Sequence, residues 1–388
     1  MKKKIAIVFN RMIVGGAEKA LINFLNAIDK SKYDITLFTF NNEGAYFDLI
    51  PKDVTIKYTK FDNSKEYLKQ LIRSMNIREL FNSLFCRIMI RLCRDEYKKF
   101  SYTLRTYPKF DEQYDCAIAY KMNFEDTATV IWRILADKKC AIMHSDINRV
   151  RKSTDRFILL LLLLLLDKIF CVSRACQQTL KDAYPMHANK TEVMYNIFPY
   201  SQILNLADRN ISPSLFENSL VTVGRLSAEK GQQLIPRTTR LLLDAGYDIH
   251  WYLIGDGPLR ETVELECSKN QVHDRVHFLG SLDNPYPYIK NCDIYVQPSF
   301  SEGYCTTTIE AKILKKPIVT TNAPGMREQF VSGENGIIVD AMTPESLFKG
   351  IKSLLDHPEL REKLAKALSL ETFDNTSELD KLYRFIES

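Results

Sequence analysis

Short apolar runs recur along the chain, and segments with the spacing of amphipathic helices lie between them. Apolar runs of about four to eight residues bounded by turn residues are typical of buried β-strands. The strands expected in the first half are 5–9, 35–40, 54–58, 116–120, 140–144, 168–173 and 192–196. Those expected in the second half are 220–225, 249–255, 276–280, 294–297, 317–321 and 336–339. Because strands alternate with helices, we expect an α/β fold with parallel, doubly wound sheets.

A polar stretch, residues 208–219, separates the two series of strands and predicts a linker. A chain of 388 residues is also longer than one hydrophobic core usually supports. We therefore expect two domains, 1–208 and 209–371, with a C-terminal helix at about 372–388 that packs back on the first. Two such domains would face a central cleft lined by the carboxyl ends of their strands.

Charge and cysteine content indicate the surface partners and the cellular compartment of the protein. The net charge is +5, and the segment 65–105 holds ten Lys or Arg against four Asp or Glu, so we expect an anionic surface to meet the protein there. The nine cysteines lack CxxC or Cys/His metal spacing, and the chain opens on a strand rather than a signal sequence. We therefore expect a reduced, cytoplasmic compartment. No segment resembles a nucleic-acid-binding module.

The basic segment includes a stretch, 80–99, with the pattern of an amphipathic helix. One helical face is apolar and consists of Phe81, Leu84, Phe85, Ile88, Met89 and Leu92. Another face is basic and consists of Arg87, Arg91, Arg94 and Lys98. The pattern fits a helix on an anionic membrane surface, where lipid-linked acceptors reside, and equally a surface helix packed on the sheet.

The longest apolar run, 157–166, includes eight consecutive leucines. As a helix it would be about 15 Å long, half of what a bilayer core requires. The run therefore predicts a helix buried in front of the strand at 168, and no transmembrane segment is expected.

Candidate chemistry is densest in residues 298–321, PSFSEGYCTTTIEAKILKKPIVTT. A helix that begins near Thr306 would put Glu302 in the loop after a strand and Glu310 in the second helical turn. Ligands of open α/β sheets bind at that end of the strands. First-turn amides, here around Thr306 and Thr307, can bind a diphosphate, and a carboxylate one turn deeper can bind ribose hydroxyls. Considered alone, Glu302 could equally be an ordinary loop carboxylate and Glu310 an ordinary solvated helix residue. The surrounding motifs must therefore decide whether the two residues bind a ligand.

Other loops at expected strand ends carry cations and glycines. In GRLSAEKG, Arg225 and Lys230 stand on a strand-to-helix turn, where a guanidinium and an ammonium can hold a pyrophosphate. Gly224 and Gly255 would let the backbone approach a ligand closely. The loop GDGP lacks the third glycine of a dinucleotide fingerprint and its place after the first strand, which argues against a nicotinamide site.

In this order, the motifs GRLSAEKG, IGDGP, VHFLG, PSFSEGY followed by Glu310, and GENGIIV resemble the second domain of the family 4 (group 1) retaining glycosyltransferases of the GT-B fold. The resemblance covers about residues 220–340. Weaker similarity in the first half includes VGGAEK, CAIMHSD and YNIFP. The pattern is similar to the branch that builds bacterial capsular, exopolysaccharide and lipopolysaccharide chains.

The resemblance implies a role for each motif residue in the second domain. Arg225 and Lys230 would hold the diphosphate of a nucleotide sugar, and Glu310 would bind its ribose. Glu302 would bind hydroxyls of the donor sugar. Cations and amides that stabilise a departing diphosphate need no metal, and the chain has no Asp-x-Asp motif to bind one. The backbone that would assist Glu302 is that of Gly303 and Tyr304.

The resemblance also points to three residues of the first domain. His144 ends an expected strand and would hydrogen-bond a sugar hydroxyl or position the acceptor, although a lone histidine also fits a structural role. Gly15 and Gly16 match the family's glycine-rich loop, which lies against the donor phosphates and the acceptor. The alternative for these glycines is a plain helix start.

These expectations combine into one function. We expect a metal-independent, retaining transferase that uses no cofactor and lies in the cytoplasm or peripherally on the inner membrane face. It would move a hexose from a nucleotide sugar, first of all a UDP-hexose, to a growing surface polysaccharide or a lipid-linked oligosaccharide. The alternatives are a sugar-nucleotide epimerase of the same architecture and a non-catalytic membrane or partner scaffold.

Overall fold

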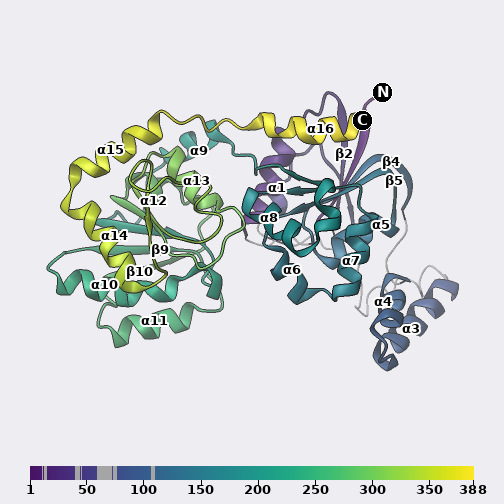
Figure 1. Ribbon diagram of the computed structural model, residues 1–388, viewed down its shortest axis with the longest axis horizontal. Helices are drawn as coiled ribbons and strands as arrows, with labels where there is room; N and C mark the ends of the chain where they lie inside the picture. Colours follow the sequence, from purple (N-terminus) through teal and green to yellow (C-terminus); the bar gives the residue numbers. More distant parts are fainter. Residues whose placement is uncertain are drawn as a thin grey trace. The chain divides into compact units, whose positions relative to one another are not determined.

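The computed structural model describes residues 1–10, 12, 15–39, 44, 46–58, 72, 77–105 and 110–388. Several expected features lie partly outside these residues, namely the end of the strand 35–40, the basic segment before residue 77 and the residues directly before Gly15. The chain divides into two compact units, residues 1–195 with 377–388 and residues 196–376, and Figure 1 shows both.

The first unit is built on a seven-stranded parallel sheet in the order β3-β2-β1-β4-β5-β6-β7. Its strands are β1 (Lys3–Val8), β2 (Tyr33–Thr39), β3 (Thr55–Tyr58), β4 (Phe110–Ala119), β5 (Ile134–Met143), β6 (Lys168–Cys171) and β7 (Thr191–Val193). Each overlaps an apolar run that predicted a strand. The expected doubly wound sheet is therefore confirmed, and its strand order reverses between β1 and β4.

Helices flank this sheet and connect its parallel strands. They are α1 (Gly16–Ala27), α3 (Ile77–Leu92), α4 (Glu96–Arg105), α5 (Phe124–Trp132), α6 (Ile147–Ser153), α7 (Arg156–Leu165), α8 (Arg174–Ala183) and α16 (Leu379–Glu387). Short 3-10 turns are η1 (Phe47–Leu49), η2 (Pro185–Lys190) and η5 (Thr376–Glu378). The leucine-rich α7 precedes β6, as the sequence predicted, and buries Leu159, Leu162 and Leu163. Its burial is only partial, because Phe157, Leu164 and Leu165 are exposed. Among the described residues, no helix combines the length and apolarity needed to cross a bilayer.

The last helix, α16, completes the first unit (Figure 1). The ring of Tyr383 stacks on that of Tyr33 with centroids 5.0 Å apart, and its hydroxyl accepts a 2.9 Å hydrogen bond from the amide of Asp29. Lys3 Nζ donates to the carbonyl oxygen of Ile386 at 3.0 Å. These contacts fix the C-terminal residues against the beginning of the chain.

The second unit has a six-stranded parallel sheet in the order β10-β9-β8-β11-β12-β13. Its strands are β8 (Ser219–Val223), β9 (His250–Ile254), β10 (Val276–Gly280), β11 (Ile294–Gln297), β12 (Ile318–Thr321) and β13 (Ile337–Val339). Its helices are α9 (Tyr200–Ala207), α10 (Ile235–Asp244), α11 (Arg260–Lys269), α12 (Tyr286–Asn291), α13 (Thr306–Ile313), α14 (Pro344–Asp356) and α15 (Pro358–Ser369). Short 3-10 turns are η3 (Ala228–Lys230) and η4 (Gln232–Leu234). All six strands again coincide with predicted runs.

The boundary between the units lies at 195/196, where the sequence analysis put it at 208/209. Helix α9 accounts for the difference because it packs against α12 and α13 of the second unit. Its residue Ile203 is fully buried in the core beside those helices. The polar stretch 208–219 therefore runs within the second unit rather than between the units.

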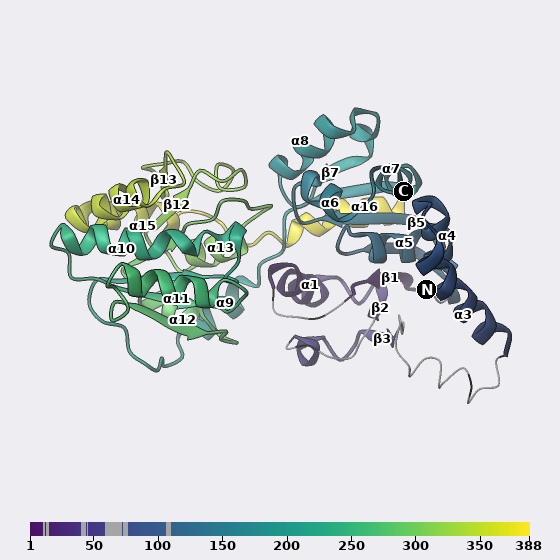
Figure 2. The same cartoon turned by 90° about the horizontal axis from the view of Figure 1, so that it is seen from below.

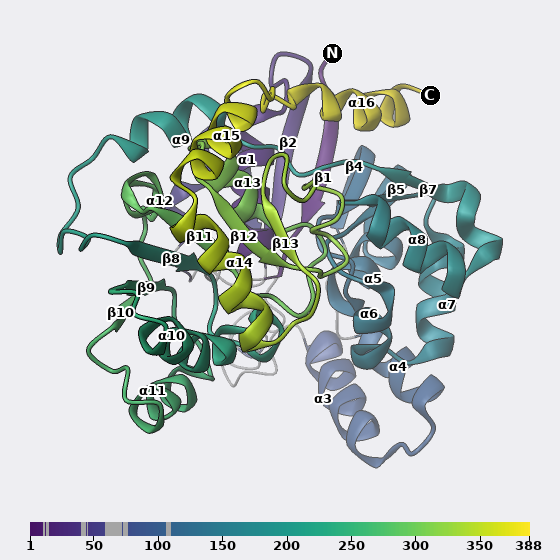
Figure 3. The ribbon, with the colours of Figure 1, turned by 60° about the vertical axis from the view of Figure 1, so that its left-hand side comes forward.

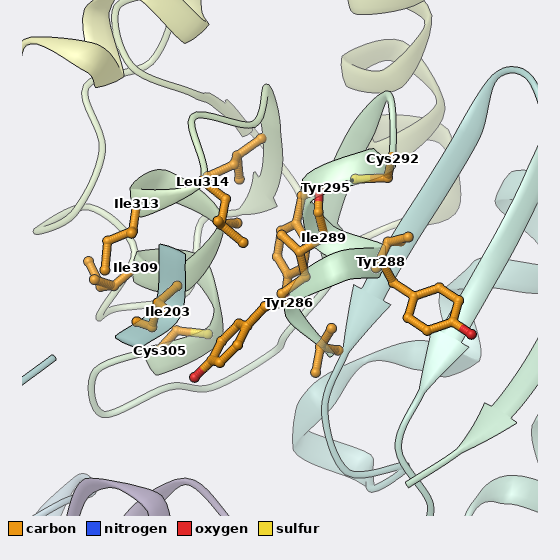
Figure 4. Close-up of a cluster of buried hydrophobic side chains, with 14 of the residues drawn as sticks. Ile203, Tyr286, Tyr288, Ile289, Cys292, Tyr295, Cys305, Ile309, Ile313 and Leu314 are labelled. Atoms are coloured by element: carbon orange, nitrogen blue, oxygen red, sulfur yellow. Dashed lines mark hydrogen bonds between the residues drawn. The ribbon is translucent and has the colours of Figure 1, made fainter. Parts of the chain in front are cut away.

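Two hydrophobic cores cover the two faces of the second sheet. One contains Val221 and Tyr295 with residues of α9, α12 and α13, and Figure 4 shows part of it. The other contains Leu220 and Val296 with residues of α10, α11 and α14, and α14 lies across β12 and β13 (Figure 3). Neighbouring residues of one strand thus enter opposite cores, which explains why the strands read as continuous apolar runs.

Candidate functional site

The loops that follow β8 and β11 lie at the same edge of the second sheet, because these two strands are parallel neighbours. From β8 the chain continues to β9 on one side, while β11 lies on the other side. This is the point where the strand order reverses, and open α/β sheets bind ligands there. The first loop carries Arg225 and Lys230, and the second carries Glu302.

Lys230 and Glu302 form an ion pair across these loops. The lysine Nζ lies 2.8 Å from Oε1 and 3.0 Å from Oε2 of the glutamate, whose side chain is only 8% exposed. Burial alone would lower the pKa of Lys230, but the charge of Glu302 outweighs it and holds that pKa above its ordinary value. The lysine is therefore charged at neutral pH. The sequence analysis gave the two residues separate tasks and did not predict their pairing.

A chain of side-chain hydrogen bonds, buried or partly buried, fixes the position of the Glu302 carboxylate. Ser299 Oγ donates to Glu302 Oε1 at 2.6 Å, and Gln297 Nε2 donates to Ser299 Oγ at 2.9 Å. The other end of the Gln297 amide, Oε1, accepts from the hydroxyls of Tyr295 at 2.8 Å and Thr307 at 3.1 Å. Because Thr307 lies in the first turn of α13, this network ties Glu302 to that helix.

Two glycines let the loops at this edge pack backbone against backbone. Gly231 has φ +72°, and a Cβ there would lie 1.9 Å from the carbonyl oxygen of Pro298. Gly255 has φ +137°, and a Cβ there would lie 2.1 Å from the carbonyl oxygen of Gly224. A side chain at either position would push the loops apart as well as strain the backbone.

Helix α13 begins at Thr306, as the sequence predicted, so the amides of its first turn have no partner within the helix. Glu310 lies in the second turn and is 1% exposed, which rules out the solvated alternative. Its Oε1 accepts a 3.3 Å hydrogen bond from the Tyr286 hydroxyl. First-turn amides that can bind an anion and a buried carboxylate therefore lie one turn apart on the same helix.

The remaining predicted residues of the second unit belong to the loops that follow β8 and β11. The Arg225 side chain is exposed and forms no ion pair with any described residue, while its carbonyl oxygen accepts from Gln232 Nε2 at 3.0 Å. The carbonyl oxygen of Gly303 would lie 2.9 Å from a Cβ on Gly325, so those two loops touch. The ring of Tyr304 packs beside that of Phe198, with centroids 6.4 Å apart.

A second, partly buried ion pair, absent from the sequence predictions, anchors the far end of α13. Lys312 Nζ lies 2.7 Å from Glu371 Oε2 and donates to the carbonyl oxygen of Gln329 at 2.8 Å. Asn335 Nδ2 donates to the other oxygen of the Glu371 carboxylate at 2.7 Å. No local motif marks this pair, because its residues come from helix α13 and the segment after α15. Within the described ranges, no group of three His, Cys, Asp or Glu is placed to hold a metal ion.

His144, Gly15 and Gly16 belong to the first unit. The ring of His144 follows β5 and lies against that of Tyr120, with centroids 5.2 Å apart. Burial lowers the pKa of His144 to about 4, so the imidazole is neutral at neutral pH. Its Nε2 is buried and has no hydrogen-bond partner among the described residues. A neutral ring nitrogen of this kind can accept or donate one hydrogen bond.

The two glycines begin α1 at the carboxyl edge of β1, with Gly15 as the extended N-cap and Gly16 as the first helical residue. The buried carboxylate of Glu18 folds back over this N-terminus, because a Cβ on Gly15 would lie 2.3 Å from Glu18 Oε2. The sequence analysis missed Glu18. A glycine followed three residues later by glutamate, as in a capping box, is the signal that could have found it.

Residues 208–369 match a family model described as glycosyl transferases group 1. An N-acetylgalactosaminyltransferase of Campylobacter jejuni, which acts on N-acetylgalactosamine-N,N'-diacetylbacillosaminyl-diphospho-undecaprenol, is 26% identical over 55% of this chain and 58% of its own length. The chain thus spans little more than half the length of that relative. An uncharacterized glycosyltransferase of Haemophilus influenzae is 23% identical over 93% of this chain and 92% of its own length.

The solved structures confirm the fold. HepE from Anabaena in complex with UDP-glucose aligns over 99% of both chains with a TM-score of 0.71 and 18% identity. Two parallel-sheet, Rossmann-like α/β domains are therefore present here, and the structural neighbours are GT-B glycosyltransferases.

Proposed function

We propose that this protein transfers a hexose from a UDP-hexose to a growing cell-surface polysaccharide or a lipid-linked oligosaccharide. The proposal rests on the ion-paired Lys230 and Glu302 at the point of strand reversal, beside the anion-binding start of α13. A cation, a fixed carboxylate and free amides at one sheet edge suit a ligand with a diphosphate and hydroxyl groups. The order of the motifs and the names of the relatives support the same reaction.

Lys230, Arg225 and the first-turn amides of α13 stabilise the leaving group in this proposal. When the bond between the anomeric carbon and the diphosphate oxygen breaks, negative charge grows on the diphosphate. Cations and amides already in place stabilise that charge without reorganising, which lowers the barrier. Glu310 binds the ribose, so that the nucleotide is held on the helix whose amides meet its phosphates.

Glu302 binds hydroxyls of the donor sugar, with the backbone of Gly303 and Tyr304. An acceptor hydroxyl attacks the anomeric carbon from the side of the departing diphosphate, and its proton passes to a diphosphate oxygen. The new glycosidic bond then has the anomeric configuration of the donor. This retaining course follows from the family resemblance, and neither a metal ion nor a cofactor takes part in it.

His144 positions a hydroxyl of the acceptor or of the sugar in this scheme. Its depressed pKa keeps the ring neutral, so it contributes a hydrogen bond and not a charge. Gly15 and Gly16 lie against the donor phosphates and the acceptor in this scheme, as the family's glycine-rich loop does, and the Glu18 carboxylate moves aside from the N-terminus of α1 when the phosphates bind. The acceptor named for the Campylobacter jejuni relative carries diphospho-undecaprenol, which supports a lipid-linked substrate.

Product analysis tests the proposal. Purified protein is incubated with a panel of UDP- and GDP-sugars, with and without lipid-linked oligosaccharides extracted from a bacterium. Free nucleoside diphosphate that appears only with acceptor supports transfer, and the anomeric configuration of the product, read by NMR, tests retention. An isomerised sugar nucleotide formed without acceptor would identify an epimerase. Absence of nucleotide binding in calorimetry would identify a non-catalytic scaffold.

A further inference from the structure

We propose that the exposed apolar face of helix α3 docks on a bilayer surface that contains anionic phospholipids. Helices α3 and α4 lie side by side as a helical hairpin of the first unit (Figure 2). The inference concerns lipid binding alone and is independent of the proposed reaction. It starts from the sequence pattern, which fitted either a membrane-facing helix or a helix packed on the sheet.

Large apolar side chains of α3 are exposed along one face. At about 100° per residue they fall within a sector roughly 100° wide. Their exposed fractions are 64% for Ile77, 71% for Phe81, 40% for Leu84, 51% for Phe85, 54% for Ile88 and 71% for Leu92. A contiguous apolar strip of this kind is unusual on a soluble surface and marks an interaction site.

The opposite face of α3 packs on its partner helix. Cys86, which the helical repeat places nearly opposite the apolar strip, is fully buried. At the margin of the strip, the rings of Phe85 and Tyr102 of α4 meet edge to face with centroids 5.9 Å apart. The exposed strip therefore points away from α4, and the alternative of an apolar face packed on the sheet is excluded for the described residues.

The hairpin is attached to the rest of the unit through α4. The ring of Phe100, 7% exposed, lies 5.3 Å from that of Phe124 and 5.5 Å from that of Trp132, both of α5 (centroid distances). This aromatic contact fixes α4 on α5, and among the described residues no element covers the outer face of α3. The strip is thus held outward by packing at the other side of the hairpin.

The charges beside the strip identify the partner as an anionic lipid surface. Arg87 and Arg91 flank one side of it, and Arg94 and Lys98 follow in the turn and in α4, with the acids Asp95 and Glu96 between them in the sequence. Apolar side chains enter the acyl region while arginine stems carry their charge to the headgroup phosphates. A symmetric pairing of two copies through this face would bring like charges together, which disfavours a dimer.

Vesicle co-sedimentation with the full chain tests the proposal. The wild type is compared on phosphatidylcholine vesicles and on vesicles that also contain phosphatidylglycerol. The double variant Phe81→Ser/Ile88→Ser removes apolar surface, and the triple variant Arg87→Gln/Arg91→Gln/Arg94→Gln removes charge. Leu265→Ser is the matched control, because Leu265 is 57% exposed on α11 of the second unit. Circular dichroism establishes that each variant is folded.

We expect the wild type to bind the anionic vesicles, and each α3 variant to bind them at least about ten-fold more weakly. Leu265→Ser should bind like the wild type, and added salt should weaken the wild type more than the triple variant. Equal binding by the wild type and the double variant would overturn the proposal. So would a wild type that ignores lipid but forms a dimer that Phe81→Ser/Ile88→Ser dissociates, because the strip would then be a self-association surface.

Discussion

The ammonium of Lys230 and the carboxylate of Glu302 meet at 2.8 Å although 72 positions of sequence separate them. If either group left this pair, the charge of its partner would remain partly buried and unpaired. Each group therefore holds the other in place. A diphosphate that binds the lysine ammonium would weaken the ion pair, and the carboxylate would then be available to accept hydrogen bonds from sugar hydroxyls. In the proposed mechanism the pair would therefore couple binding of the diphosphate to binding of the sugar hydroxyls.

Substitution of the lysine should reduce transfer strongly. Lys230→Ala is expected to lower turnover at least about ten-fold, because the charge that stabilises the leaving group is lost. Steady-state kinetics and calorimetric binding of UDP measure the effect. Lys269→Ala serves as the control, since its ammonium pairs at 2.7 Å with Glu266 on the exposed surface of α11. Near-native kinetics in Lys230→Ala would contradict the assigned site.

Loss of the buried amide behind Glu302 should impair the reaction more than nucleotide binding. Gln297→Ala removes the link between Ser299 and Thr307, so we expect a fall in kcat of at least about three-fold with little change in UDP affinity. Thr222→Val is the control. The hydroxyl of Thr222 accepts from Trp251 Nε1 at 3.0 Å and donates to the carbonyl oxygen of Val296 at 2.7 Å, but it is not one of the side chains that form the Glu302 network. Equal kinetic effects of the two substitutions would show that Gln297 acts only through stability.

A methyl group at Gly231 should damage the loop contact that aligns Lys230. Gly231→Ala would place its Cβ against the Pro298 carbonyl, whereas Gly246→Ala, also at positive φ, meets no atom within 4 Å. Both substitutions carry the strain of a left-handed backbone, about 1–2 kcal/mol. The excess loss of unfolding free energy and of activity in Gly231→Ala therefore reports the clash. Chemical denaturation and transfer assays should show no excess if the two loops do not touch.

The buried imidazole of His144 should make stability depend on pH. Its pKa of about 4 in the folded chain lies below the ordinary value of 6.5, so the unfolded chain binds more protons between these values. The stabilising contribution is present above about pH 6.5 and is lost as the pH falls toward 4, by up to about 3 kcal/mol. Thermal unfolding from pH 7 to pH 4.5 should show this loss, and His144→Gln should reduce it. The exposed His273→Gln is the control, and a slope unchanged by His144→Gln would contradict the pKa.

Chelation of divalent ions should leave transfer unchanged. In the proposed mechanism Lys230, Arg225 and the first-turn amides of α13 stabilise the charge of the departing diphosphate. EDTA should therefore have no effect on the rate. The assay is run at matched ionic strength, because bulk salt also screens the cations. Rate loss that Mg²⁺ or Mn²⁺ restores would show that a metal ion supplies part of this charge.

The sequence predicted the strands and the start of α13 because both depend on local patterns. Apolar runs that enter two cores, and a helix that begins after a glycine-containing loop, can be read from neighbouring residues alone. The Lys230–Glu302 pair and the Lys312–Glu371 pair could not, because they depend on how distant loops meet. The boundary was misplaced for the same reason, since α9 follows the last strand of one unit yet packs on helices of the other.

Helix α16 also constrains how the first unit can fold during translation. The first unit begins with β1 but lacks its covering helix until residues 379–387 have been translated. Residues 196–376 emerge before that helix and are complete in themselves. The first unit therefore cannot acquire α16 until residues 196–376 have been translated, and a chain truncated before Tyr383 lacks the ring that stacks on Tyr33.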